Sequence, residues 1–168
     1  MSLSRLIVLA LMLSAMAAQA QAAVASLMCQ STAVQALVRT EGLTERVGEM
    51  VFTCNGNIPN GDVGATFNVF LNAPVTNRVN DDGMTDATLT VDAGPGTTPQ
   101  TVRARLIPPG TLIFEFVNWT LTAVPVTTIS IANIRVNATG SAARAITAAV
   151  STTGISRIVT NQPNLTVG

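Results

Sequence analysis

The sequence predicts an all-β fold, a single antiparallel β-sandwich of the Ig-like or jelly-roll-like kind, preceded by a signal-peptide helix. Short runs rich in Val, Ile, Thr, Phe and Leu alternate with clusters of Gly, Pro, Asn and Asp, which is typical of β-strands and their turns. No Lys- or Glu-rich helical pattern follows the first 22 residues. We therefore predict a signal peptide at 1–22 and one β-sandwich domain at 23–168, about 146 residues long.

The first residues have the three parts of a secretory signal. Arg5 supplies positive charge, Leu6 to Ala18 form an apolar run, and 18–22 contain two overlapping Ala-x-Ala cleavage sites. We expect a mature N-terminus near Gln21 or Ala23 and a secreted or cell-surface location. The apolar run is too short for a permanent span of a ~30 Å hydrocarbon core, so no integral membrane span is expected after signal removal.

The remaining elements follow from local patterns. Residues Val63, Ala65, Phe67, Val69 and Leu71 alternate onto one face. In 128–136 the apolar positions change face at Ala132-Asn133, which predicts a β-bulge. Segment 141–150 is Ala-rich, which favours a helix, but its β-branched end favours a strand, and we predict a strand. The predicted strands are Val34–Arg39, Arg46–Thr53, Val63–Leu71, Val75–Asn80, Ala87–Val91, Thr101–Ile107, Leu112–Val117, Thr120–Val124, Thr127–Val136, Ala145–Val150 and Ile155–Val159.

Cys29 and Cys54 are the two cysteines, and in an exported chain they are expected to form a disulfide. Their midpoint falls between Glu41 and Gly42, in a stretch that separates two apolar runs. A tight hairpin turn there would bring the two cysteines opposite each other. The alternative is a longer loop, Thr40 to Thr44, with the bond tying an N-terminal arm to a neighbouring strand.

Charge is sparse and balanced. The chain has nine basic residues, all Arg, and nine acidic ones. It therefore lacks the basic stripe of a nucleic-acid-binding protein, and no nucleic-acid partner is expected. Near-neutrality and the absence of Lys from sheet edges favour self-association, and a C-terminal strand around Val167, if unpaired, could complete a neighbour's sheet.

The catalytic repertoire is narrow. Without His or Lys the chain cannot build a Ser-His-Asp triad or a Schiff base, so we predict a non-enzymatic protein with no cofactor and no catalytic residue. Glu115 is the one carboxylate in an apolar run, and alternation predicts that it faces outward between inward-facing Phe114 and Phe116.

A weak calcium candidate lies in the loop 80–86. Asn80, Asp82 and Asp86 offer oxygen ligands and Gly83 permits a sharp turn. The spacing is not that of an EF-hand, and Asn and Asp are also common turn residues. Accordingly no metal site is assigned.

The segment 38–56 contains the pattern Arg-x-Glu-Gly-x-Thr-Glu-x-Val-Gly followed by Cys-x-Gly. It resembles the opening of a group of secreted, β-rich bacterial proteins of the acidobacterial type. Segments 70–79, 86–92 and 131–137 also resemble that group. The resemblance implies an exported, β-rich protein and implies no particular activity.

These observations favour a secreted non-enzymatic β-sandwich that acts in cell-surface structure, adhesion or assembly. One alternative is a carbohydrate-binding or carbohydrate-cleaving module, which exposed aromatic side chains beside Glu115 would support. Another is a small outer-membrane β-barrel, whose strands would need ~9–11 residues each.

Overall fold

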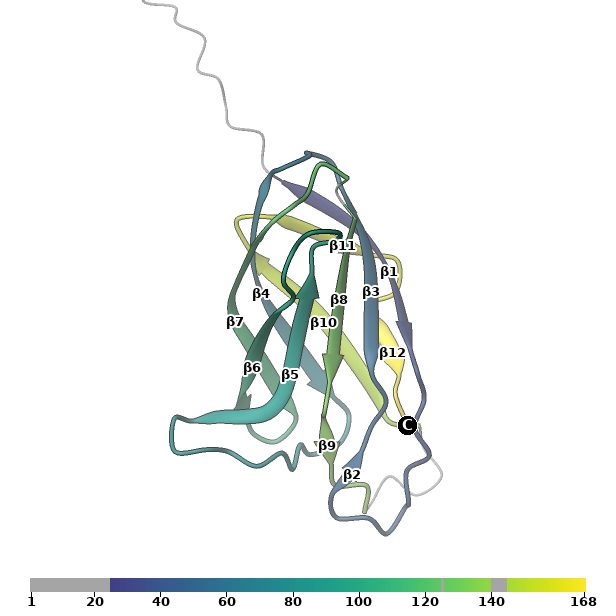
Figure 1. The fold of residues 1–168 in the computed structure, drawn as a ribbon. Helices are drawn as coiled ribbons and strands as arrows, with labels where there is room; N and C mark the ends of the chain where they lie inside the picture. The colour runs from purple at the N-terminus through teal and green to yellow at the C-terminus, as the bar shows by residue number, and fades with distance from the viewer. Residues whose placement is uncertain (1–24, 125, 140–144) are drawn as a thin grey trace, which may run out of the picture.

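The computed structural model describes residues 25–124, 126–139 and 145–168 (Figure 1). The prediction of an all-β fold is confirmed, because every regular element in these ranges is a strand. The predicted signal peptide and its helix lie outside the described residues. The strands are β1 Ser26–Ala33, β2 Glu45–Arg46, β3 Met50–Gly56, β4 Asp62–Leu71, β5 Met84–Asp92, β6 Gln100–Ile107, β7 Thr111–Thr120, β8 Val126–Ala132, β9 Arg135–Val136, β10 Thr147–Gly154, β11 Arg157–Thr160 and β12 Asn164–Thr166.

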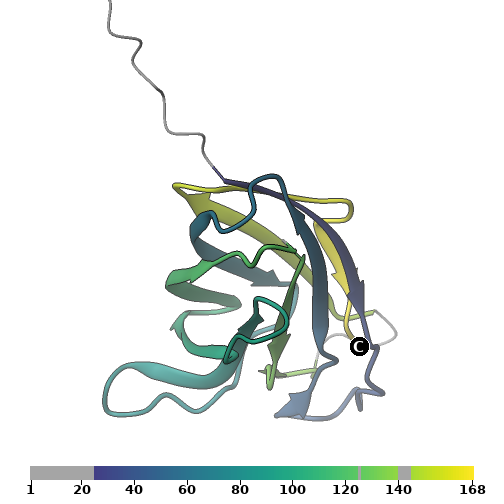
Figure 2. The same cartoon turned by 45° about the horizontal axis from the view of Figure 1, so that its top comes forward.

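Ten strands form one continuous sheet in the order β11-β1-β3-β8-β5-β6-β7-β4-β10-β12. The sheet curls around a central core, as the two views show (Figures 1 and 2). Neighbouring strands are antiparallel except β1 and β11, which are parallel. The layers expected of a sandwich are therefore opposite parts of one curled sheet. A separate two-stranded pair joins β2 to β9.

Alternation along the strands fills the core as the sequence predicts. On β4 the residues Val63, Ala65, Phe67 and Val69 are buried. The change of face between β8 and β9 is also confirmed, because Ile129, Ile131, Ile134 and Val136 are all buried and Asn133 between them has a φ of 60°. A left-handed residue at this point turns the backbone so that both halves of the run can face inward.

The C-terminal segment changes partner and so joins the two edges of the curled sheet. β11 pairs with β1, and three residues later β12 pairs with β10. The carbonyl oxygen of Val167 then accepts hydrogen bonds from the backbone N–H groups of Ala36, at 3.1 Å, and Gly48, at 2.7 Å. The condition under which the stretch around Val167 could complete a neighbour's sheet is not met, because this stretch is paired within the chain and Val167 is fully buried.

Several predicted strands differ from the structure. Segment 34–39 is irregular, and Leu37 is 99% exposed. Its backbone makes only scattered hydrogen bonds, such as the one that Val34 N–H donates to the Glu49 carbonyl. Segment 75–80 makes only two isolated bridges, at Val75 and Val79. The two runs expected at 112–117 and 120–124 are replaced by one strand, β7. β1 was not predicted.

The predicted disulfide is confirmed. Cys29 on β1 and Cys54 on β3 are bonded, with Cα atoms 4.0 Å apart, and they are opposite each other in the ladder. The tight hairpin at Glu41-Gly42 is wrong, because an irregular loop with a two-residue strand, β2, connects Ala33 to Met50. A turn does occur where it was expected, since Gly42 N–H donates to the Arg39 carbonyl at 3.0 Å, but it lies within that loop.

Candidate functional site

The three residues of the calcium candidate have separate partners. The backbone N–H of Asn80 donates to the Met84 carbonyl at 2.8 Å, which closes the turn. Asp82 accepts the Met84 N–H at 3.0 Å and pairs with Arg103 on β6. Asp86 accepts a hydrogen bond from the side-chain amide of Asn77 at 2.7 Å. Among the described residues no three Asp, Glu or Cys side chains are grouped so that they could hold a metal ion, and the loop is accounted for by its turn and its ion pair.

The electrostatics of Asp82 follow from these contacts. The Met84 N–H, and after it the hydrogen bond from Arg103, hold the pKa of Asp82 below its ordinary value of 3.8. Both donors favour the charged form of the carboxylate. Asp82 therefore acts as an acceptor that ties the 80–84 turn to β6.

Glu115 is also paired with an arginine. Its Oε2 lies 3.2 Å from Arg105 Nη2 on the neighbouring β6, and both side chains are partly exposed. Phe114 is fully buried, as predicted. The prediction that Phe116 also faces inward is wrong, because its side chain is 82% exposed.

A β-bulge in β7 is the reason for this outcome. Ala65 is opposite Val117 and Phe67 is opposite Phe114, so Glu115 and Phe116 together oppose Thr66. The extra residue changes the phase of the strand, and Val117 and Trp119 become the inward residues. Phe116 has a φ of 54°, a left-handed conformation that is rare for a bulky side chain. Its carbonyl accepts a hydrogen bond from Asn118 Nδ2 at 3.1 Å.

Phe116 lies between the Glu115–Arg105 ion pair and a row of uncharged outward residues on β4 and β10. The outward residues of β4 after Asp62 pair with those of β10: Phe70 with Ala149, Asn68 with Ser151, and Thr66 with Thr153. At the Phe116 end, Ile155 is 75% exposed and its side chain lies over Gly64. We call this surface the Phe116 face; it consists of Thr66, Asn68, Phe70, Phe116, Ala149, Ser151, Thr153 and Ile155.

Next to this face two neighbouring strands of the sheet, β6 and β7, separate from each other. β6 and β7 are paired only where Arg105–Ile107 meet Thr111–Ile113, so their other ends are not hydrogen-bonded to each other. Two adjoining hollows, of about 370 and 310 Å³, lie near those ends and share the lining residues Gln100, Trp119 and Thr120. We call the two hollows together the Trp119 cleft. The first is also lined by Asp62, Val63, Asn118 and Ile155, and the second by Val91, Ala93, Thr97 and Thr98.

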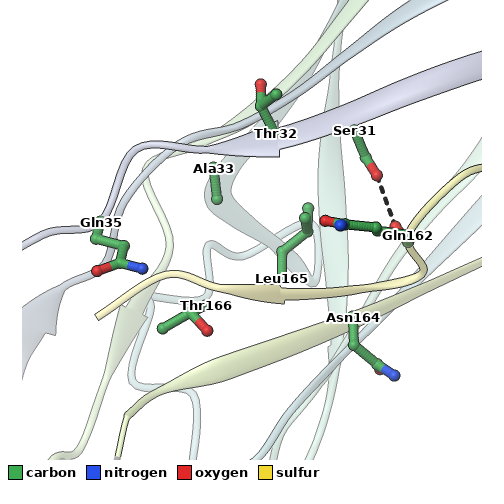
Figure 3. A pocket seen from close by; sticks show the side chains of 8 residues that line it. All are labelled: Ser31, Thr32, Ala33, Gln35, Gln162, Asn164, Leu165 and Thr166. Carbon is green, nitrogen blue, oxygen red and sulfur yellow. Dashed lines mark hydrogen bonds between the residues drawn. The ribbon is translucent and has the colours of Figure 1, made fainter.

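A third hollow, of about 390 Å³, lies where β1 and β12 run side by side (Figure 3). The Ser31 hydroxyl at one end donates to the Gln162 carbonyl at 2.6 Å. Gln35 and Thr166 lie toward the other end (Figure 3). The hollow is lined by uncharged side chains, which are polar except for Ala33 and Leu165. Ser31, its one buried polar residue, already holds the Asn161–Gln162 turn through hydrogen bonds.

Sequence reasoning missed both the Phe116 face and the Trp119 cleft. The single Trp of the chain was the available signal for the cleft, but nothing local shows that β6 and β7 separate beside it. No helix in the described ranges is long and apolar enough to span a membrane. Neither models of known protein families nor curated proteins match this chain.

Proposed function

We propose that this chain is a non-enzymatic, extracytoplasmic domain that acts in cell-surface structure or adhesion by assembling with further copies of itself through the Phe116 face. The observation that carries the proposal is the conformation of Phe116. Its side chain is 82% exposed on a left-handed backbone, and this conformation costs roughly 1–2 kcal/mol. Neither the strain nor the exposed ring stabilises the isolated domain, and such features concentrate at functional surfaces.

A second copy is the partner that fits this face best. The residues of the face are uncharged, and Glu115, which opposes Thr66 beside Phe116, is already paired with Arg105, so two copies that meet on the face bury no unpaired charge. The whole chain has nine basic and nine acidic residues, so net repulsion between copies is small. Apolar side chains lie at both ends, Phe70 and Ile155. The centre between them consists of Thr66, Asn68, Ser151 and Thr153, whose short side chains allow close approach of two sheets.

The location is supported by the disulfide. Cys29 and Cys54 are buried and bonded, and such bonds persist outside the cytoplasm, where thiols are not kept reduced. The signal-like features of residues 1–22 support the same location.

Sedimentation of residues 23–168 over a wide concentration range tests the proposal. The wild type is expected to show a sedimentation coefficient that rises with concentration, and Phe116→Asn is expected to remain monomeric. Asn keeps the left-handed backbone and removes the ring. Leu37→Asn is the matched control, because it removes another strongly exposed apolar side chain, from the irregular segment 34–39, and it should associate like the wild type. A monomeric wild type, or association that persists unchanged in Phe116→Asn, contradicts the proposal.

A further inference from the structure

One segment, residues 157–168, closes the curled sheet by contacting both of its edges (Figure 1). We call it the closing segment. Its first part, β11, runs parallel to β1 over four residue pairs, and its second part, β12, runs antiparallel to β10 over three. Within the described chain no ladder joins β11 to β10 or β12 to β1. Each edge strand is therefore paired with the closing segment over at most half of its length.

The unpaired halves leave two hollows along the closing segment. One, of about 390 Å³, lies between β1 and β12 (Figure 3), and the other, of about 290 Å³, is lined by residues 152–158, where β11 leaves β10. The Thr152 hydroxyl donates to the Ile158 carbonyl across the second hollow at 3.4 Å, which is long for such a bond.

The closing segment is held less firmly than the strands inside the sheet. Each of those strands has a ladder on both sides, whereas the closing segment has a ladder on one side at a time. It contributes two fully buried apolar side chains to the core, Leu165 and Val167. Detachment of this segment therefore breaks fewer contacts than removal of an inner strand, and it is a local opening rather than global unfolding.

The connection between β10 and the closing segment is short. Ile155 and Ser156 are its two residues, and the chain reverses at Gly154, which has a φ of 146°. A Cβ at Gly154 would lie 2.6 Å from the Gly64 carbonyl oxygen, so this reversal leaves no room for a side chain. Short connections of this kind favour exchange between copies, because the chain can extend into a second copy instead of reversing.

The strand that precedes this connection also belongs to the Phe116 face. Ala149, Ser151 and Thr153 are the outward residues of β10 on that face. Two copies that meet there hold each closing segment next to the sheet edges of the other copy. Exchange keeps the contacts of the closing segment, because the same residues meet the same edges in the other copy. The contacts made on the Phe116 face are then additional, and they favour the exchanged dimer over two monomers.

We infer that two copies associated through the Phe116 face exchange their closing segments. β11 of each copy pairs with β1 of the other, and β12 of each copy pairs with β10 of the other. The inference rests on the proposed function, because the face brings the two copies together. It adds that the assembled copies are interlocked through backbone ladders and not only held by side-chain contacts.

Mixing two single-cysteine variants of residues 23–168 tests the exchange. Ser26 and Arg157 are directly opposed in the β1–β11 ladder, and the natural cysteines leave no free thiol. Ser26→Cys chains mixed with Arg157→Cys chains at high concentration, and treated with a short bismaleimide, are expected to give a covalent dimer with one chain of each variant. Thr90→Cys with Thr101→Cys is the matched control, since these residues are opposed on β5 and β6, which do not exchange. This pair should give no covalent dimer.

The outcomes separate this inference from the assembly proposal. A yield no higher than that of the control pair, in a protein that associates in sedimentation, overturns the exchange and leaves the assembly intact. A wild type that stays monomeric and gives no covalent dimer overturns both. A yield that is unchanged when both chains also carry Phe116→Asn supports the exchange and overturns the role of the face.

Lengthening the connection is a second test. Insertion of Gly-Ser-Gly between Ile155 and Ser156 lets the chain reverse easily within one copy, so the covalent dimer should be lost while association in sedimentation persists. A covalent dimer that forms as well with the insertion as without it contradicts the part given to the short connection.

Discussion

Cys29 and Cys54 form a directly opposed, non-hydrogen-bonded pair across β1 and β3. The backbone bonds at the two ends of this ladder involve Ser26, which accepts from Asn57, and Val34, which donates to Glu49. Hydrogen-bonded and non-hydrogen-bonded pairs alternate along an antiparallel ladder. The even-numbered residues of β1 are therefore hydrogen-bonded to β3, and Cys29 is at a non-hydrogen-bonded position. Cα atoms are closest at such positions, in agreement with the 4.0 Å separation.

Removing the disulfide is expected to destabilise the domain without changing its fold. The bond closes a loop of 25 residues, which corresponds to roughly 3 kcal/mol of unfolding free energy. For a domain of this size the melting temperature should fall on the order of 10 °C. Denaturant and thermal unfolding of the Cys29→Ala/Cys54→Ala variant measure both quantities, with reduced wild type as the control. A loss below about 1 kcal/mol would mean that the loop is already constrained in the unfolded chain.

Gly48 is expected to tolerate no side chain, because it lies where the two edges of the sheet meet. A Cβ at this position would be 1.4 Å from the Val34 carbonyl oxygen and 3.1 Å from that of Val167. Backbone atoms cannot swing away, so Gly48→Ala should cost at least about 2–3 kcal/mol of unfolding free energy. In Gly42→Ala, the control from the same loop, the new methyl meets only the flexible Glu45 side chain, and a change within about 0.5 kcal/mol is expected. Similar losses in both variants would refute the role given to Gly48.

Phe116→Asn is expected to stabilise the isolated domain, which is unusual for the loss of an aromatic residue. Asn adopts the left-handed conformation more readily than Phe, so relief of backbone strain should add about 1 kcal/mol. Phe70→Asn is the comparison, because Phe70 lies at a regular position of β4 and is less exposed, where Asn is unfavourable. Chemical denaturation should show changes of opposite sign. A loss of stability in Phe116→Asn would show that the ring packs against the bulge in a way that stabilises the fold.

Local sequence patterns were sufficient where one strand alone determines the outcome. The alternation of β4 and the change of face at Ala132-Asn133 both depend on which residues of a single segment are apolar. The bond between the two cysteines was predicted correctly, but the tight hairpin expected to place them opposite each other is replaced by the loop from Ala33 to Met50. β1 was missed because one of its inward positions holds a polar residue, Ser31, which hides the alternation of apolar and polar residues. Hydrogen bonds to the Gln162 carbonyl and Asn161 Oδ1 allow its hydroxyl to be buried there.

The candidate sites depend on pairings between distant segments, and local patterns do not reveal these. The exposure of Phe116 results from a β-bulge, in which two residues of β7 lie opposite Thr66 of β4. The Trp119 cleft exists because β6 stays paired with β5 while β7 stays paired with β4. As a result, β6 and β7 separate from each other after three residue pairs. The exchange of partners from β11 to β12 is equally non-local.

Export is expected to remove the first residues. Overlapping Ala-x-Ala sites at 18–22 predict a mature N-terminus near Gln21 or Ala23. Mass spectrometry of the protein from an exporting bacterial host measures this directly. Retention of Met1 in the exported fraction would contradict the prediction, and cytoplasmic protein from the same cells provides the uncleaved reference.

The pKa of Asp82 offers a test of how the 80–84 turn is held to β6. It lies below the ordinary value of 3.8, first because Met84 N–H donates to the carboxylate and second because of Arg103. A lowered pKa means that the charged form is favoured in the folded state. The resulting stabilisation is present above pH 3.8 and is lost as the pH falls through the folded pKa.

In Arg103→Met the pKa of Asp82 should rise but stay below 3.8, because the Met84 N–H is the larger cause. NMR titration of the Asp82 carboxyl measures the shift, and Arg105→Met, which removes the partner of Glu115 instead, should leave it unchanged. A pKa of 3.8 or above in Arg103→Met would show that the ion pair, and not the turn, holds the carboxylate in its charged form.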